Sequence, residues 1–287
     1  MSPLPARGSW SLAAVALIAA LVLLTGCGGS PSRTTTTTSP SPTPTRPVPA
    51  PGGTAAIARS WGAPSWSDEF SGSSVGRAWG RYDGPGNDDN GLRRPSQVAV
   101  AGGLLTETGT REATSGGMAL RGHDALTGRW EVRARADQGA GPGAAYRAVV
   151  ALIPADVPYA SGARDLDLLL ADVGSPTTNF FLHYPPGKQD YAETTVDLTG
   201  WHTFGVEIAP DHVTWFVDGN PTVTDLDRAA LPTTPMTLGV QLDATAPNGM
   251  IPARFQLDWA RYYPLPAGTV PVPDAPAPQT GVYDPSS

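Results

Sequence analysis

Apolar and polar residues alternate in many short segments of this chain, and Gly, Pro or Asp separates one segment from the next. Residues 130–135 and 212–217 are examples, and in residues 254–259 the alternation places Phe255, Leu257 and Trp259 on one face. A period of two residues is typical of a strand with one buried face, whereas a helix repeats its apolar residues every 3.6 positions. The best helical candidate is the short segment 225–231. We therefore predict an all-β fold.

The composition agrees with many short strands joined by turns. Gly and Pro account for 33 and 31 of the 287 residues, while charged residues make up 16%, which argues against a coiled coil or a helical bundle. Residues 148–153 are continuously apolar, as in a strand that is covered on both faces. Residues 61–264 are long enough for a jelly-roll sandwich of two antiparallel sheets.

The N-terminus has the pattern of an export signal. Arg7 precedes an unbroken apolar run at residues 12–24, which is shorter than the roughly 20 residues of a membrane-spanning helix and is typical of a signal peptide. Residues 24–27, Leu-Thr-Gly-Cys, resemble a bacterial lipobox, in which cleavage precedes the cysteine and its sulfur carries diacylglycerol. We predict a lipoprotein signal peptide over residues 1–26. Lipid attachment at Cys27 would hold the protein at the extracytoplasmic face of the cell membrane.

Two segments rich in proline flank the predicted domain. Residues 27–60 combine many prolines with a run of threonines from Thr34 to Thr38, and residues 265–287 are also Pro-rich and lack periodicity. Such segments have few apolar side chains to bury. We predict a disordered, lipid-anchored linker at the first and a disordered tail at the second.

Charge and cysteine content exclude several classes of protein. The net charge is −7, so no basic footprint indicates a nucleic-acid partner. Cys27 is the single cysteine, which excludes an internal disulfide and a Cys-rich metal site. The four histidines are scattered and lack metal-ligand spacing. We predict neither a metal nor a cofactor.

Four blocks of residues resemble glycoside hydrolase family 16, the laminarinase and lichenase group. Residues 67–70, Ser-Asp-Glu-Phe, resemble its opening strand, and residues 127–134, Thr-Gly-Arg-Trp-Glu-Val-Arg-Ala, resemble a central strand. Residues 201–219 and 255–263 resemble two later strands. The blocks stand in the family's order and extend over nearly the whole domain. The resemblance implies a concanavalin-like jelly roll and a glycoside hydrolase or carbohydrate-binding function.

The resemblance also implies where the catalytic strand lies. The family carries Glu-x-Asp-x-Glu or Glu-x-Asp-x-x-Glu, in which the first Glu is the nucleophile and the last the acid/base, with carboxyl groups about 5–5.5 Å apart. Here Asp165 and Asp167 stand at the first two positions, and the acid/base position falls on Leu169 or Leu170, depending on a bulge. None of the six glutamates lies in this strand. Asp172 is a candidate substitute acid, and only a sharp turn after Ala171 would bring it to Asp165.

Four further residues match positions in the cleft of the family. His183 and His202 match histidines near the cleft, and Gln241 and Asp243 lie where the family has Asn on its concave side. The resemblance implies that they bind carbohydrate. The alternatives are that the histidines serve packing and that Gln241 and Asp243 face water.

The aromatic residues divide into two groups. Three share apolar faces and are predicted to be core: Trp130, Trp215 and Trp259. One or two of the others could stack on a sugar: Trp61, Trp66, Trp79 and Trp201. Ala151 stands where the family usually has a Trp before an apolar run.

Three functions remain open. The first is a cell-envelope lipoprotein that binds β-glucan or another cell-wall glycan and is catalytically impaired, because the acid/base Glu is missing. The second is an active retaining endo-β-glucanase or transglycosylase that uses Asp165 and Asp167. The third is a structural envelope protein without a sugar site. The fold alone does not choose among them.

Overall fold

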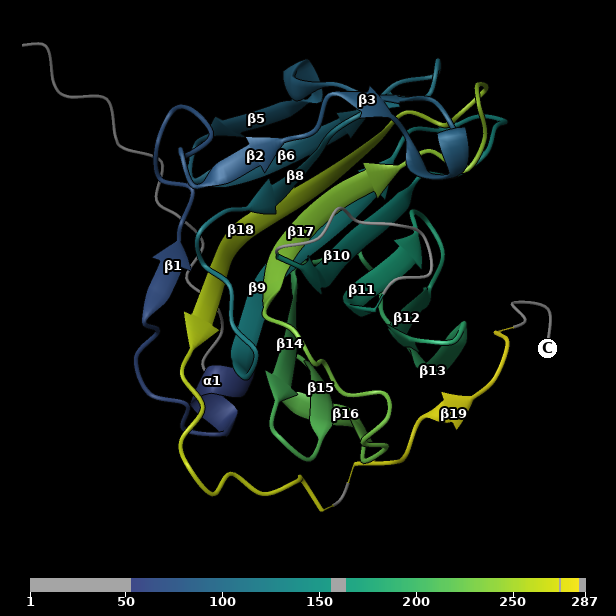
Figure 1. Ribbon diagram of the computed structural model, residues 1–287. Helices are drawn as coiled ribbons and strands as arrows, with labels where there is room; N and C mark the ends of the chain where they lie inside the picture. The colour runs from purple at the N-terminus through teal and green to yellow at the C-terminus, as the bar shows by residue number, and fades with distance from the viewer. Residues whose placement is uncertain (1–52, 156–163, 274, 284–287) are drawn as a thin grey trace, which may run out of the picture. The chain divides into compact units, whose positions relative to one another are not determined.

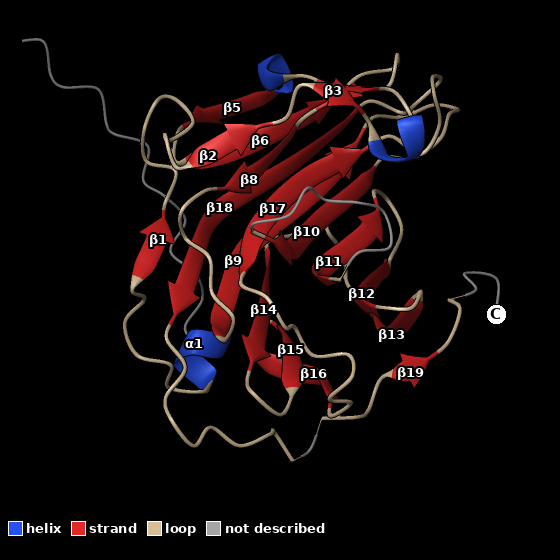
Figure 2. Ribbon diagram, in the orientation of Figure 1, coloured by secondary structure: helices blue, strands red, loops and turns tan. Residues whose placement is uncertain are grey.

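The computed structural model describes residues 53–155, 164–273 and 275–283, and these form two large antiparallel sheets (Figures 1 and 2). Cys27, the predicted signal peptide and residues 27–52 of the linker lie outside the described residues. The predicted all-β sandwich of two antiparallel sheets is confirmed.

Sheet A is built around β9, the middle strand of its spatial order. In spatial order they are β16 (Asn220–Asp225), β15 (Val213–Val217), β14 (His202–Ile208), β9 (Gly128–Gln138), β18 (Ala253–Tyr263), β6 (Leu104–Gly109) and β5 (Val98–Ala101), with β1 (Trp66–Asp68) paired to β18.

Sheet B contains β11, the strand that carries the predicted catalytic residues Asp165 and Asp167. In spatial order they are β19 (Gln279–Thr280), β13 (Lys188–Thr195), β12 (Thr177–Tyr184), β11 (Asp165–Asp172), β10 (Arg147–Pro154), β17 (Met236–Asp243), β8 (Gly117–Leu120) and β2 (Trp79–Arg81). The remaining elements are a small sheet of β3 (Gly84–Pro85), β4 (Leu92–Arg93) and β7 (Thr114–Ser115), the helix α1 (Ala55–Ala58) and the 3-10 turns η1 (Asn87–Asp89) and η2 (Pro95–Gln97).

The core lies between the two sheets because alternate residues of each strand point inward. Trp130 and Trp215 are both 2% exposed and are buried there, as predicted. Trp259 is also buried, but the pairing of β18 with β9 shifts by one residue just before it. This irregularity turns Trp259 away from Phe255 and Leu257, and its ring lies 4.1 Å from the guanidinium carbon of Arg261.

The structure corrects three sequence predictions about the elements. Residues 225–231 are not helical: β16 ends at Asp225 and a turn follows. The tail is not wholly disordered, because β19 pairs with β13. The linker ends before residue 60, because Thr54 caps α1 and Ala55 is fully buried. Ordered structure therefore extends beyond both ends of residues 61–264.

None of the helices in the described ranges is long and apolar enough to cross a membrane.

Candidate functional site

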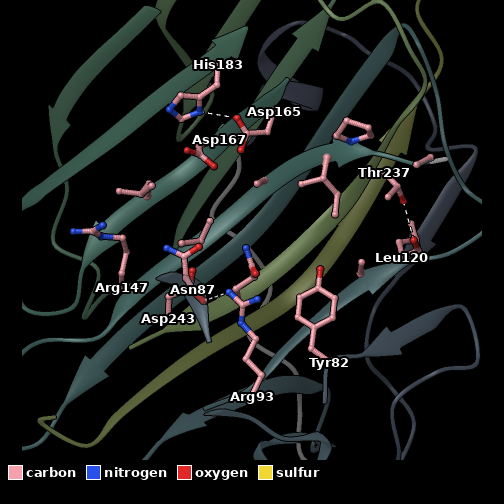
Figure 3. A pocket seen from close by; sticks show the side chains of 18 of the residues that line it. Tyr82, Asn87, Arg93, Leu120, Arg147, Asp165, Asp167, His183, Thr237 and Asp243 are labelled. Atoms are coloured by element: carbon pink, nitrogen blue, oxygen red, sulfur yellow. Dashed lines mark hydrogen bonds and ion pairs between the residues drawn. The ribbon is translucent and has the colours of Figure 1, made fainter. Parts of the chain in front are cut away.

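Two adjoining cavities form a groove across the outer face of sheet B. The first cavity, of about 590 Å³, lies over β11, β10 and β17. The second cavity, of about 770 Å³, lies over β12 and β13. Arg147, Leu170 and His183 line both cavities and mark their junction. The groove is thus continuous across several strands, and Figure 3 shows its first cavity.

Strand β11 brings the two predicted catalytic residues to the same cavity. Asp165 and Asp167 line the first cavity (Figure 3), whereas Leu166 and Leu168 between and beside them lie in the core. The aspartates are only 6% and 4% exposed. The period-two spacing therefore places both carboxyl groups on the floor of the groove, largely shielded from solvent.

A β-bulge decides which of the two leucines, Leu169 or Leu170, faces the groove. The pairing of β11 with β10 shifts by one residue between Val150 and Ala151. As a result Leu168 and Leu169 are both buried in the core, and Leu170 takes the groove side, where it lines both cavities. Of the two candidate leucines, Leu170 is therefore the one that faces the groove, as expected when one extra residue re-aims the strand.

The two aspartates have different electrostatic surroundings. Oδ1 of Asp165 lies 2.6 Å from Nδ1 of His183. Burial raises the pKa of Asp167 well above the ordinary value, and the negative charge of Asp165 raises it further. Burial lowers the pKa of His183, but the hydrogen bond and charge of Asp165 outweigh it, so the net shift is upward. Asp165 thus has a basic partner, while Asp167 favours its protonated form.

Asp172 and Glu193, the carboxylates that line the second cavity, do not stand near Asp165. The sharp turn that Asp172 would need is missing, because β11 remains a strand through Asp172. Asp172 is paired with Arg147 at 2.8 Å. Glu193 reaches the second cavity from β13. The register Asp165↔His183↔Gln189 sets it four residues along and two strands across, roughly 16 Å away.

The other end of the first cavity is built around an ion pair. Gln241 and Asp243 line it from β17, and Nη2 of Arg93 lies 2.5 Å from Oδ1 of Asp243. Burial raises the pKa of Asp243, although Arg93 opposes the shift. Tyr82 lies against Arg93, with its ring 5.3 Å from the guanidinium carbon. A Cβ at Gly117 would approach the Tyr82 ring to 2.7 Å, so glycine is needed there for this packing.

His202 is not brought to the groove. It lies on β14 in sheet A, where Nδ1 is 2.7 Å from Oδ2 of Asp218 and Nε2 is 3.0 Å from the carbonyl oxygen of Asp197. These contacts hold the first residue of β14 in sheet A, away from both cavities. Of the four residues predicted to bind carbohydrate, His183, Gln241 and Asp243 therefore line the groove and His202 does not.

The four tryptophans that were candidates for sugar stacking lie elsewhere. Trp61 packs on Phe216, and Trp201 lies under Arg133 and Arg135. Trp66 and Trp79 contact each other, and none of the four lines either cavity. Ala151 does line the first cavity. The described aromatic side chains of the groove are instead Tyr82, Phe181 and Tyr283.

The groove residues that no sequence pattern had indicated include Arg147, Arg93 and Tyr82. Arg147 could have been found, because the alternation that puts Ala151 on the groove side extends back to Arg147. Residues 148–153 hid this alternation by being apolar on both faces. Arg93 and Tyr82 lie on a short strand and a loop with no periodicity, and only the fold brings them to β17.

The described part of the chain has no group of three or more His, Cys, Asp or Glu side chains that could hold a metal ion.

A sandwich with paired carboxyl groups on a strand under an open groove has the architecture of a glycoside hydrolase. A family model described as glycosyl hydrolases family 16 matches residues 92–261. The chain belongs to this family.

Solved structures of similar fold are laminarinases. The catalytic domain of an endo-1,3-β-glucanase from Thermotoga petrophila is 19% identical, with a TM-score of 0.59, over 70% of this chain and 97% of that one. The laminarinase from Rhodothermus marinus is 21% identical, with a TM-score of 0.59, over 70% and 96%. An endo-β-1,3-glucanase from Pyrococcus furiosus is 19% identical, with a TM-score of 0.58, over 71% and 95%. These similarities establish the fold. No curated protein sequence matches this chain.

Proposed function

We propose that this protein binds a β-glucan or a related cell-wall polysaccharide in the groove of sheet B and is impaired in hydrolysis. The observation that carries the proposal is Leu170. Its side chain lies at the junction of the two cavities, at the position from which the family's acid protonates the leaving oxygen. An alkyl side chain has no proton to give, and general acid catalysis typically contributes 10²–10⁴-fold in rate.

The nucleophile position is impaired as well. Asp165 is one methylene shorter than Glu, so its carboxylate lies roughly 1.5 Å further from the sugar. A misplacement of about 1 Å can cost on the order of a hundredfold in rate. Asp165 is also held by His183 at 2.6 Å. The groove keeps its walls and polar groups, which supports binding without efficient turnover.

The ligand class follows from the relatives. The proteins of similar fold include laminarinases and endo-1,3-β-glucanases, so laminarin is the first polysaccharide to test. The experiment is isothermal titration of the protein with laminarin, lichenan and a galactan, together with an assay for new reducing ends. Saturable heat without new reducing ends supports the proposal. No heat with any of these or with a broad glycan array would contradict it and would favour a structural envelope protein.

A second candidate function is slow hydrolysis or transglycosylation. One observation favours it: burial and Asp165 raise the pKa of Asp167, so a protonated carboxyl group stands beside a paired carboxylate, as acid/base chemistry needs. In this case reducing ends appear slowly and disappear in both Asp165→Asn and Asp167→Asn. Activity that survives both substitutions would exclude this pair as the site.

We also propose that the protein is lipid-anchored at Cys27 on the extracytoplasmic face of the cell membrane. The support is the sequence of residues 24–27 after an apolar run. Mass spectrometry of the membrane-bound protein should find diacylglycerol on an N-terminal Cys27. Cys27→Ala should leave the protein unlipidated, and wild-type protein without lipid would refute the anchor.

A further inference from the structure

The C-terminal tail follows the region matched by the family model, which ends at residue 261, yet it forms part of the groove. The tail passes β16, where N of Thr224 donates to the carbonyl oxygen of Pro276 at 2.8 Å. It then adds β19 to the free edge of β13, with Tyr191 opposite Gln279 (Figure 1). The tail is therefore attached to both sheets.

Side-chain contacts hold the end of the tail against sheet B. The hydroxyl of Tyr191 donates to Oε1 of Gln279 at 3.1 Å. The ring of Tyr283 meets the ring of Phe181 edge-on at 5.4 Å and that of Tyr191 at 5.2 Å. Its hydroxyl donates to Oε2 of Glu193 at 3.4 Å. Edge-on aromatic pairs of this spacing are favourable, so Tyr283 has a defined position.

The tail lines the second cavity without filling it. Val282 and Tyr283 are lining residues, and about 770 Å³ remains with the tail in place, within the range of ligand sites in proteins. Asn179 lines the same cavity and is only 8% exposed. Its amide oxygen has no hydrogen-bond partner among the described residues. A buried acceptor without a partner is costly, and a ligand hydroxyl would satisfy it.

We propose that the tail is one wall of a sugar-binding subsite in the second cavity. The inference rests on the proposed function and adds where the glycan is held: Tyr283 offers an aromatic face, and Asn179 and Glu193 offer acceptors to sugar hydroxyls. The matching ligand is a glycan chain whose rings have one apolar face and equatorial hydroxyls at the rim. Tyr283 thereby replaces the stacking surface that is absent at Ala151, on the opposite side of Leu170.

Titration of the full-length protein with a laminari-oligosaccharide of six glucose units tests this wall. Tyr283→Ala should weaken binding by about tenfold, or 1.4 kcal/mol. Tyr283→Phe keeps the ring and should stay within about twofold to threefold of wild type. Val270→Ala is the matched control, because Val270 lies on the same tail, is 74% exposed and lines neither cavity; its binding should be unchanged. Thermal unfolding of each variant should be close to wild type, since neither Tyr283 nor Val270 belongs to the hydrophobic core.

The outcomes separate this inference from the proposed function. If wild type binds and Tyr283→Ala binds equally well, the wall is refuted and glycan binding stands. Tighter binding by Tyr283→Ala would also refute it, because the tail would then obstruct the groove. If wild type binds none of the glycans on a broad array, the proposed function fails, and the subsite fails with it.

Discussion

Leu170 lies on the groove side of β11, at the position where the proposed function puts the missing acid. The bulge in β11 is present and turns position 170 toward the groove, so the backbone geometry for an acid has been kept. The proposed impairment is therefore chemical and local, and it can be tested by substitution.

Replacing Leu170 by Glu together with Asp165 by Glu should create hydrolytic activity. The double substitution supplies a proton donor and lengthens the nucleophile, so that the two carboxyl groups can approach the 5–5.5 Å of a retaining pair. We expect at least a hundredfold increase in reducing ends released from laminarin. Leu170→Gln with Asp165→Glu is the control, since it has the same shape and no acid. Equal activity in both would show that position 170 is not the acid/base site.

The contact between Asp165 and His183 should be visible in the titration of the histidine. Burial alone lowers the pKa of His183, and the hydrogen bond and charge of Asp165 reverse this. In wild type the pKa measured by NMR should lie above the usual value of about 6.5. In Asp165→Asn the pKa of His183 should be lower than in wild type. An unchanged pKa in the variant would mean that the 2.6 Å contact is not made in solution.

Sequence alone could place Asp165 and Asp167 on one face, because strands have a fixed period of two. It could not choose between Leu169 and Leu170, because a bulge depends on pairing with the neighbouring strand. His183 and His202 both stand on alternating segments, and only their assignment to different sheets separates them. The pair of Arg93 and Asp243 joins residues 150 positions apart, which no local pattern predicts.

Among the elements, the tail and β16 meet β13 over a buried acidic pair. Asp190 on β13 and Asp225 on β16 are both 2% exposed and within hydrogen-bonding range of each other. Burial raises the pKa of Asp225 to about 6; the backbone N–H of Asp227 opposes this, and Asp190 adds to it. Two carboxyl groups at this separation can share one proton. The edge that receives the tail is thus most stable when one of them is protonated.

Asp225→Asn should make the protein more stable than wild type at neutral and higher pH. A carboxyl group whose pKa is higher in the folded than in the unfolded state stabilises the fold fully below about pH 4, and this contribution is lost as the pH rises through 6. At pH 8 the variant should exceed wild type by about 2 to 3 kcal/mol, and near pH 4 the two should differ by less than about 1 kcal/mol. Urea unfolding at pH 4, 6 and 8 measures both. Parallel pH profiles would refute the assignment.

The tail shows why composition did not predict which segments pair with a sheet. Prolines and the lack of periodicity argue for disorder when a segment is considered alone. Here β13 leaves an edge unpaired, and two residues of tail are enough to pair with it. The segment 225–231 failed for a related reason: its local sequence permits a helix, but the adjacent strand and turn hydrogen bonds determine its structure.

At the scale of the whole molecule, the residues before β1 pack against the outer face of sheet A. N of Ala55 donates to Oε1 of the buried Glu131 at 2.5 Å. Trp61 packs on Phe216 and Tyr263, which lie on the outer face of sheet A. This short segment therefore covers one face of sheet A, as the groove occupies one face of sheet B.

A protein that begins at Trp61 should be less stable than one that begins at Gly53. The shorter chain loses the N–H partner of Glu131 and the packing of Ala55. An unsatisfied buried polar group costs about 1–3 kcal/mol, and lost apolar burial adds to this, so we expect a loss of about 2–4 kcal/mol in chemical denaturation. Equal stability of the two proteins would show that α1 does not contribute.

The chain enters the sandwich behind the groove. The carbonyl oxygen of Gly53 accepts from Oγ1 of Thr203 on β14, so the described chain begins against sheet A, while Asp165, Leu170 and Tyr283 line the groove of sheet B. An anchor attached ahead of Gly53 would transmit force to β14 in sheet A and would leave the groove of sheet B open. Coupling the protein to a bead through its N-terminus should keep the groove accessible to long polymers. Coupling through the C-terminus would crowd the wall that Tyr283 forms.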